Sequence, residues 1–581
     1  MMQEVLFNET LNTDGFITDF ALGTTYSLNL DALLSIPLSL GFMGEIDEES
    51  RLSPHYLLEA IRQSTDRFVV FNNVGQITVP SKTNKLYSLL EKSLVQVKIP
   101  LMGKSFINFH PKVWILKESS TETEEHRIKV IVMSRNLSFS KDIDVVCELS
   151  GRIGKGKASA AKNKHKPLID FVSYLANMTE GDLRMKIDSL IDDIAHVKKF
   201  ALDENLFSDY EFFPMGISGY NGKETCLAKM KDKLRWSMII SPFVDMHTLT
   251  ELSPKSYTNS KSTLITRQNN VTSDIVKQFD GEVYVVNGIM VDNNELNTNV
   301  DIHEKIYFTS DGSNNYMYLG STNATENGFE RNVEFLLKLK FKEYKKSYDS
   351  FKNEFIFDGK ECIFEKATTY NNEPKHNEDI GDELLLKKAI NSIGNANVTP
   401  TDDRFVVQVA CDSDFEDVSL YPLYNSNMKQ TFKKGLVFGD IQLSELTEFY
   451  VIEAGSIKRL IKIATNGIPL IKRDNSIFSS LIDTKDKFIN YISFMISDDK
   501  EEFMCEQSCN EANHGGGKMS GLTMPGNNLY ENMLKLVYSD VDRLKEIKDV
   551  IKKLDKNVVP QEFSSLYEKF ENVIKKIKYK Q

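Results

Sequence analysis

The chain has 581 residues, of which 41% are hydrophobic and 27% are charged, a composition typical of globular proteins. This length is enough for three or four domains, and no apolar run approaches the roughly 18 to 20 residues of a membrane span. The net charge of −12 by itself opposes nucleic-acid binding, because phosphate contacts need Lys and Arg. Six scattered cysteines exclude a disulfide framework. The first residues lack the basic start and apolar core of a signal peptide, so we expect a cytoplasmic protein with no membrane partner.

The first predicted unit is an α/β half over residues 1–205. Short β-branched and aromatic runs predict strands at 109–116 and 128–133. His110 and Lys112 are separated by one residue, so in a strand their side chains lie on one face. The full set of polar residues carried or bordered by these strands is His110, Lys112, Ser134, Asn136 and Glu148.

A basic segment follows, from Gly151 to Pro167, and contains no acidic residue. Because it comes directly after the strand of Glu148, we expect it to leave from the rim of a site and to contact the phosphates of a nucleic acid. A solvated connector is the alternative. The basic residues are Arg152, Lys155, Lys157, Lys162, Lys164 and Lys166.

The second predicted half covers residues 206–370 and repeats the same ordered set. Aromatic and β-branched runs at 302–308 and 332–338 again predict strands. Two His–Lys pairs on such strands would place two imidazoles and two ammonium groups around one small volume, which suits a phosphodiester. The repeated residues are His303, Lys305, Ser321, Asn323 and Glu334.

At these residues the chain resembles the phospholipase D superfamily, whose two motif copies meet in one active site. The resemblance covers roughly residues 14–345 and implies an α/β fold in which two halves form one pseudo-twofold catalytic unit. It implies that one of His110 and His303 is the nucleophile and the other the general acid, with His110 favoured as the nucleophile.

The resemblance also implies roles for the remaining motif residues. The lysines and asparagines would hold the phosphate oxygens: Lys112, Lys305, Asn136 and Asn323. Glu148 and Glu334 would each fix the far nitrogen of a catalytic histidine. Ser134 and Ser321 would support the site beside the asparagines.

The sequence departs from the commonest family motif at one position of each half. An Asp is usual five residues after the Lys, but Lys117 and Ser310 stand there. This departure is similar to the tyrosyl-DNA phosphodiesterase branch and to some nuclease branches, and it favours a nuclease over a lipid hydrolase.

The rest of the chain differs in character. A polar, acidic stretch at 371–383 marks a boundary before a predicted β-rich accessory domain at 384–500. A flexible loop is expected at 501–526, and amphipathic helices at 527–581 would dock on the protein itself or capture a partner. The loop contains too few metal ligands for a usual zinc site, since only three stand close together: Cys505, Cys509 and His514.

The sequence therefore predicts a phosphodiesterase or nuclease that cleaves nucleic acid, with DNA as the favoured substrate, through a covalent phosphohistidine and without metal or cofactor. By family analogy it would serve bacterial antiviral defence beside a helicase or translocating ATPase. The alternatives are a phospholipid-processing enzyme and a non-catalytic DNA-binding or scaffold subunit. DNA versus RNA, and a homo-oligomer, are left open.

Overall fold

The structure is a computed structural model that describes most of the chain. It covers residues 10–11, 15–41, 54–99, 107–139, 142–156, 162–203, 205–254, 261–286, 301–343, 347–355, 364–368, 378–497, 529–539, 541–554 and 557–578. Within these ranges, no helix combines the length and the apolar composition that crossing a membrane requires. The predicted loop at 501–526, with its two cysteines and one histidine, lies outside the described residues.

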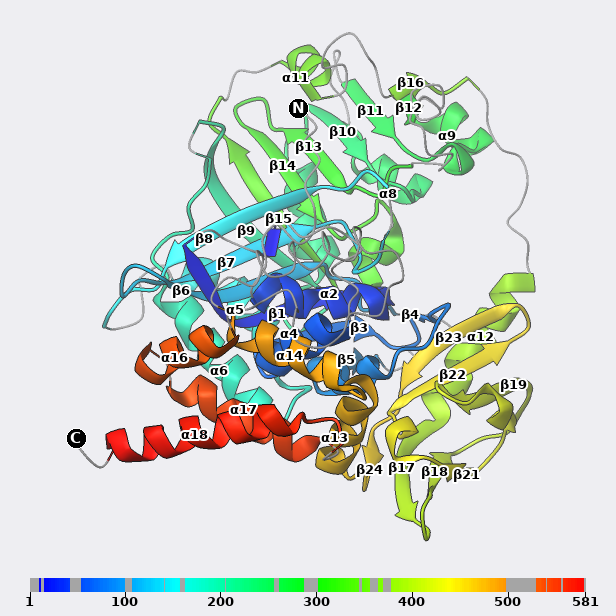
Figure 1. The fold of residues 1–581 in the computed structure, drawn as a ribbon. Helices are drawn as coiled ribbons and strands as arrows, with labels where there is room; N and C mark the ends of the chain where they lie inside the picture. Colours follow the sequence, from blue (N-terminus) through cyan, green and yellow to red (C-terminus); the bar gives the residue numbers. More distant parts are fainter. Residues whose placement is uncertain are drawn as a thin grey trace.

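The first half is built on a six-stranded mixed sheet (Figure 1). The first three strands in spatial order are parallel to one another, and each of the last three is antiparallel to the strand before it. In that order the strands are β5 (Leu94–Val97), β3 (Phe68–Asn73), β1 (Phe16–Thr25), β6 (Val113–Ser120), β7 (His126–Met133) and β8 (Val146–Arg152).

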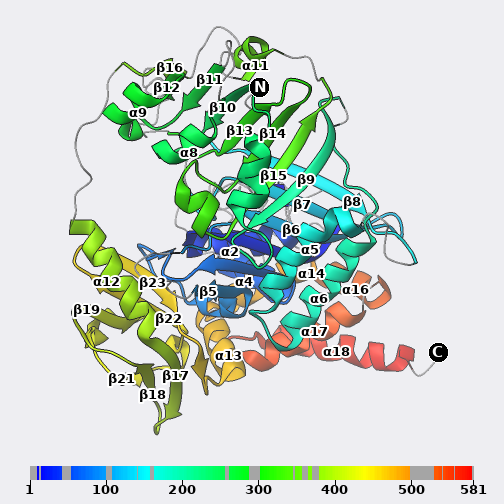
Figure 2. The same ribbon diagram turned by 180° about the vertical axis from the view of Figure 1, so that it is seen from behind.

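Alternate residues of this sheet enter two different cores. Ala21 and Val70 belong to the core that contains α2 and α4, whereas Leu22 and Val69 belong to the core that contains α5 and α6 (Figure 2). Both faces of the central strands are therefore buried, which explains their continuous apolar runs. The four helices are α2 (Leu30–Gly41), α4 (Pro54–Ser64), α5 (Lys162–Ala176) and α6 (Gly181–His196).

The second half contains an eight-stranded sheet, six strands of which repeat the order and directions of the first sheet. In spatial order the strands are β16 (Phe364–Lys366), β12 (Glu282–Val286), β11 (Lys261–Ile265), β10 (Trp236–Ile240), β13 (Ile306–Ser310), β14 (Asn315–Gly320), β15 (Glu334–Phe341) and β9 (Phe207–Met215). The repeated order is β12, β11, β10, β13, β14, β15, which corresponds strand by strand to β5, β3, β1, β6, β7, β8 of the first sheet.

One core lies between the two sheets, and a second covers the outer face of the eight-stranded sheet. Trp236 and Phe335 pack into the same core as Leu22 of the first half, so the halves are joined by apolar contact. The outer core is formed with η2 (Lys223–Leu227), α7 (Ala228–Lys231), α8 (Met246–Glu251), α9 (Ser273–Gln278) and η4 (Asn327–Arg331), and α11 (Tyr348–Phe355) packs on the shared core.

The predicted β-rich region does contain strands, but it is not a closed module. After α12 (Glu378–Ser392), one sheet has the order β21, β18, β17, β24, and a second has the order β2, β4, β23, β22, β19, β20. Strands β2 (Leu28–Asn29) and β4 (Ile77–Thr78) of this second sheet come from the first half. The others are β17 (Ile393–Pro400), β18 (Phe405–Cys411), β19 (Phe415–Pro422), β20 (Gln430–Phe432), β21 (Leu436–Ile441), β22 (Phe449–Ala454), β23 (Ile457–Lys462) and β24 (Thr465–Asn466).

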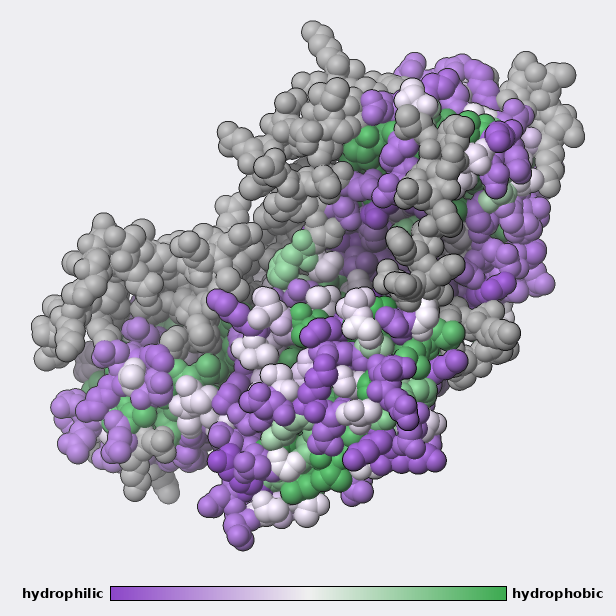
Figure 3. Space-filling model, turned by 90° about the vertical axis from the view of Figure 1, so that its right-hand side faces the viewer, coloured by the Kyte–Doolittle hydropathy of each residue, from purple (hydrophilic) through white to green (hydrophobic). Residues whose placement is uncertain are grey.

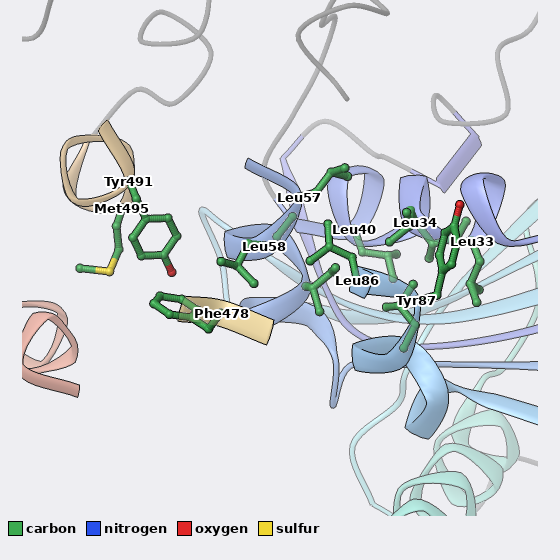
Figure 4. Packing of buried hydrophobic residues seen from close by; sticks show 14 of the residues in the cluster. Leu33, Leu34, Leu40, Leu57, Leu58, Leu86, Tyr87, Phe478, Tyr491 and Met495 are labelled. Atoms are coloured by element: carbon green, nitrogen blue, oxygen red, sulfur yellow. The ribbon is translucent and has the colours of Figure 1, made fainter. Parts of the chain in front are cut away.

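The last helices pack on the first half rather than projecting from it. In Figure 4, Phe478, Tyr491 and Met495 lie beside Leu57 and Leu58 of α4. All belong to one buried apolar cluster, which also contains Met533, Leu544 and Phe563 of the helices predicted at 527–581. These helices therefore pack on the protein's own body, and capture of a partner or of nucleic acid by them stays a prediction. The helices are α13 (Leu470–Leu481), α14 (Lys485–Ile496), α16 (Leu529–Ser539), α17 (Val541–Lys553) and α18 (Gln561–Lys578).

A buried ion pair ties α13 to η1 (Lys85–Ser93) of the first half. Arg473 Nη1 lies 2.6 Å from Glu91 Oε2, and both side chains are almost fully buried. The other oxygen of Glu91 accepts hydrogen bonds from Thr447 Oγ1 at 2.7 Å and from the backbone N–H of Glu448 at 2.8 Å. Every polar group of the carboxylate thus has a partner from outside the first half.

We expect Arg473→Ala to lower the free energy of unfolding by about 3–5 kcal/mol, because it leaves the buried Glu91 carboxylate without its cation. Denaturant unfolding measures this. Arg473→Met with Glu91→Leu should recover most of the loss, since no charge stays uncompensated. Lys487→Ala, which removes an exposed pair with Asp483, should cost less than about 1 kcal/mol. Equal losses for the two alanine variants would contradict the interpretation.

Candidate active site

Two short parallel bridges connect the halves, and each carries one motif histidine. In the first, Phe109 pairs with Val333, and the backbone N–H of His110 donates to the carbonyl of Val333 at 2.9 Å. In the second, Ile143 pairs with Ile302, and the N–H of His303 donates to the carbonyl of Ile143 at 2.8 Å. Each bridge therefore places a histidine of one half beside a carboxylate of the other half.

The first histidine is held by the predicted carboxylate. His110 Nδ1 lies 3.0 Å from Oε2 of Glu334, the first residue of β15, which is fully buried. Lys112 Nζ lies 3.1 Å from Nε2 of the same imidazole. When Lys112 is protonated it can only donate, so in that state Nε2 carries the lone pair and Nδ1–H donates to Glu334. Burial lowers the pKa of His110, with Lys112 adding to the effect and Glu334 opposing it.

The second histidine is held by Asp144, which the sequence analysis did not select. His303 Nδ1 lies 2.8 Å from Asp144 Oδ1. Burial is the largest cause that lowers the pKa of His303 to about 4, and the nearby Lys305 acts in the same direction. Burial favours the neutral form of Asp144, but hydrogen bonds from His303 and Ser134 outweigh it and lower its pKa.

Glu148 was wrongly assigned as the partner of a catalytic histidine. It lies within β8, opposite Ile131, with its side chain 41% exposed and 3.1 Å from Lys129. The site is at the start of β8, where Asp144 stands two residues before the strand. A residue two positions into the strand has already moved away from that end.

The serines identify the true correspondence between the halves. Ser134 Oγ donates to Asp144 at 2.6 Å and accepts from the backbone N–H of Val145 at 3.0 Å. Ser321 Oγ donates to Glu334 and accepts from the N–H of Phe335 at 3.0 Å. In each half a serine thus fixes the carboxylate that holds the other half's histidine.

Both lysines are buried at the centre of this arrangement. Lys112 and Lys305 are each 1% exposed and donate to the carbonyls of His110 and His303, respectively. Burial lowers the pKa of Lys112 to about 7 and that of Lys305 well below its usual value. Lys305 also lowers the pKa of His110, and Lys112 that of His303, so the four groups act on one another across the halves. An anion between them would restore the protonation that burial disfavours.

Each asparagine stands two residues after a serine that fixes a site carboxylate. Asn136 Oδ1 accepts from the backbone N–H of Ser27 at 3.4 Å. The Oδ1 atom of Asn323 is buried and has no hydrogen-bond partner among the described residues. In Asn136, whose oxygen is held by this bond, the amide N–H₂ group is left as a donor for a ligand.

Tyr26 is a further residue beside the site that the sequence analysis missed. It follows the end of β1, and its ring centroid lies 4.9 Å from that of His110. Burial, followed by the charge of Glu383 on α12, raises its pKa to about 12, so the phenol stays neutral. The accessory region therefore reaches the edge of the site. Figure 3, which views the molecule from the right-hand side of Figure 1, shows a hydrophilic hollow between its upper and lower parts.

The basic segment does not leave from the rim, so that premise was wrong. Strand β8 begins at the site and ends at Arg152, at roughly 3.3 Å per residue, so the segment leaves from the opposite end of the sheet. Four of its members pair with acids: Arg152 with Glu125, Lys155 with Glu124, Lys164 with Asp209 and Lys166 with Asp170. Lys162 begins α5, and Lys157 lies outside the described residues.

The two positions where the family usually has Asp also lie away from the histidines. Lys117 on β6 forms an ion pair of 2.6 Å with Asp193 on α6, and Ser310 ends β13. Both are five residues beyond the lysine along a strand that runs away from the site. Their side chains serve the scaffold.

No protein-family model and no curated protein matches the sequence. Among solved structures, yeast tyrosyl-DNA phosphodiesterase is 13% identical, with 60% of this chain and 87% of that chain covered and a TM-score of 0.38. Phosphatidylserine synthase of Haemophilus influenzae is 12% identical over 66% and 89%, with a TM-score of 0.34. NucT from Helicobacter pylori is 17% identical over 27% and 98%, with a TM-score of 0.21. All three are members of the phospholipase D superfamily, the family that the paired motifs of this chain resemble.

Proposed function

We propose that this protein is a phosphodiesterase that cleaves nucleic acid without a metal ion, and that its two repeated halves form one catalytic unit. The observation that carries the proposal is the pair of bridges, each of which joins a histidine to the carboxylate of the opposite half. Beside them lie two buried lysines whose pKa values remain lowered despite the nearby Glu334 and Asp144, so a bound phosphate would favour their charged forms.

The first step forms a covalent intermediate on one histidine. The Nε2 lone pair of His110 attacks phosphorus and makes an N–P bond while the bond from phosphorus to the leaving oxygen breaks. His303, protonated when the anionic substrate is bound, gives its Nε2 proton to that oxygen. Lys112, Lys305 and the two asparagines stabilise the negative charge on the phosphate oxygens.

The second step reverses the proton transfer. His303, now neutral, takes a proton from water as the water oxygen bonds to phosphorus, and the N–P bond to His110 breaks. The product leaves with the phosphate, and His303 is again protonated for the next cycle. Glu334 and Asp144 keep both imidazoles in the Nδ1–H tautomer throughout.

The contact of Lys112 with His110 favours His110 as the nucleophile. With Lys112 protonated, Nε2 is the acceptor of this contact and keeps the lone pair that attacks. Among the described residues His303 Nε2 has no such contact, and a bound phosphate would raise the pKa of His303, which burial and Lys305 lower.

The proposed substrate class depends on sequence features outside the His–Lys cluster. The two missing Asp residues favour a nuclease branch, whereas the basic segment no longer supports nucleic acid. DNA as substrate, and a helicase or ATPase partner in antiviral defence, stay predictions. A phospholipid-processing enzyme and a non-catalytic phosphate clamp are the rivals.

The test is cleavage in the presence of excess EDTA. We expect purified protein to cut a single-stranded oligonucleotide at an unchanged rate with chelator, because protein cations occupy the places that metal ions take in two-metal nucleases. Anionic lipid vesicles and RNA in parallel reactions identify the substrate class. Loss of all cleavage in EDTA with rescue by Mg²⁺ would contradict the mechanism, and release of lipid headgroup alone would establish the rival.

A further inference from the structure

The two bridges have the same plan but different chemistry. In the first, Asn332 Oδ1 accepts from the backbone N–H of Asn108 at 3.1 Å. These residues stand two positions before Glu334 and His110. In the second, Asp142 Oδ1 accepts from the N–H of Asp301 at 3.4 Å, and these residues stand two positions before Asp144 and His303. Two carboxylates therefore occupy the places that two amides occupy in the other bridge.

A third pair of equivalent positions lies at the ends of β3 and β11. The adjacent strands fix the correspondence: Thr25 Oγ1 accepts from the N–H of Leu137, and Ser241 Oγ accepts from the N–H of Ala324. Thr25 lies opposite Asn72, and Ser241 comes one residue after Ile240, which lies opposite Ile265. Asn73 is one residue beyond Asn72, and Arg267 is two residues beyond Ile265, so the two occupy equivalent positions.

Both residues contact the residue just before a histidine. Asn73 Oδ1 accepts from the N–H of Phe109 at 2.8 Å, and Arg267 Nε donates to the carbonyl of Ile302 at 2.8 Å.

Arg267 also balances the two added carboxylates. Its Nη2 lies 3.4 Å from Asp142 Oδ2, and its Nε lies 3.5 Å from Asp301 Oδ2. All three side chains are between 23% and 38% exposed, so water screens their charges only in part. Without the guanidinium, two carboxylates from opposite halves would repel each other where the chains must pair. His303 and Asp144 stand on those same two segments.

We propose that Arg267 is the positioning residue of the His303–Asp144 pair, and that it is required because Asp142 and Asp301 replace the amides of the other bridge. This inference rests on the proposed function. It assigns Arg267 to the proton-transfer branch of the reaction, and Asn73 to the branch of the nucleophile His110.

The test compares two leaving groups. A nitrophenolate departs without a proton, whereas a nucleoside alkoxide needs one from His303. We expect Arg267→Asn to slow the first-turnover cleavage of a dinucleotide roughly 10- to 100-fold, the usual range for loss of a supporting contact. The first-turnover release of nitrophenol from bis(p-nitrophenyl) phosphate should change little. Asn73→Ala should slow both.

Rescue separates a charge effect from a merely structural one. The triple variant Asp142→Asn/Asp301→Asn/Arg267→Asn copies the amide chemistry of the first bridge and should regain most of the rate that Arg267→Asn loses. Arg235→Gln, at the far end of β10, is the matched control and should behave as wild type in both reactions. Equal loss on both substrates, or a triple variant no faster than the single one, would overturn the proposal.

A readout without catalysis keeps this inference separate from the proposed function. In histidine-labelled protein, the Nδ1–H proton of His303 should give a downfield NMR resonance through its bond to Asp144. Arg267→Asn should shift or broaden that resonance and leave the His110 signal in place, and the triple variant should restore it. If the wild type cleaves neither diester, the proposed function fails, and these resonances still decide the role of Arg267. An unmoved His303 signal would overturn it.

Discussion

His110→Ala and His303→Ala are expected to fail at different steps of one reaction. His110→Ala removes the atom that bonds to phosphorus, so both the covalent intermediate and turnover should be lost, by several orders of magnitude. His303→Ala removes only the proton donor, a loss of about 10²- to 10⁴-fold where the leaving group needs a proton. Single-turnover kinetics on a dinucleotide and on bis(p-nitrophenyl) phosphate measure the difference.

The informative result is a trapped intermediate. With the nitrophenyl ester, His303→Ala should release about one nitrophenol per protein and then stop, because no base activates water for the second step. Acid-labile phosphate bound to His110 should be found by mass spectrometry at that point. Phosphate on His303 in a His110→Ala variant would reverse the two roles. Wild-type turnover by both variants would leave the motif without a catalytic function.

Asp144→Asn is expected to reduce turnover roughly 100-fold or more, and Glu148→Gln is expected to have almost no effect. An amide at position 144 presents a donor as readily as an acceptor to His303 Nδ1, so the imidazole is no longer held in the Nδ1–H tautomer. Glu334→Gln should act in the same way on His110, from the opposite half. Steady-state kinetics on an oligonucleotide give the comparison.

Two controls make this comparison decisive. Thermal unfolding should show that Asp144→Asn remains folded, because Ser134 still accepts from the backbone N–H of Val145 between the end of β7 and the start of β8. Glu148→Gln makes the same change from carboxylate to amide at an exposed position four residues after Asp144, so it is the matched control. A larger loss from Glu148→Gln than from Asp144→Asn would contradict the assignment of the carboxylates.

The histidines, lysines, serines and asparagines were predictable because the motif repeats. Their placement on strands was wrong, since both His–Lys pairs precede β6 and β13 and the serines and asparagines follow β7 and β14. The spacing from asparagine to carboxylate was misleading, since it depends on the length of the connecting loop. That loop is shorter before Asp144 than before Glu334. The carboxylate that holds a histidine is the residue directly before the one whose backbone N–H donates to the serine. The donors are Val145 for Ser134 and Phe335 for Ser321, and these hydrogen bonds are seen only in the structure.

Adjacency in sequence also gave the wrong place for the basic segment. The residues after Glu148 follow a site residue closely in the chain, but a strand of seven residues carries them to the far end of the sheet. The antiparallel pairing of β8 with β7 decides which end of the sheet β8 runs toward, and residue composition does not encode this pairing. The β-rich runs after residue 384 were predictable as strands, whereas their pairing with β2 and β4 was not, because those two strands have only two residues each.

The sheet shared between β23 and the two short strands β2 and β4 has a mechanical consequence. Strand β2 starts three residues after Thr25, and β4 starts four residues after Asn73. Tyr26 and Asn73, which touch the histidine bridge, are thus tethered on one side to the catalytic sheet and on the other to the accessory sheet. A force or a binding event that tilts the accessory sheet would be transmitted through these two tethers to the nucleophile, whereas the Arg267 side of the site has no such tether among the described residues.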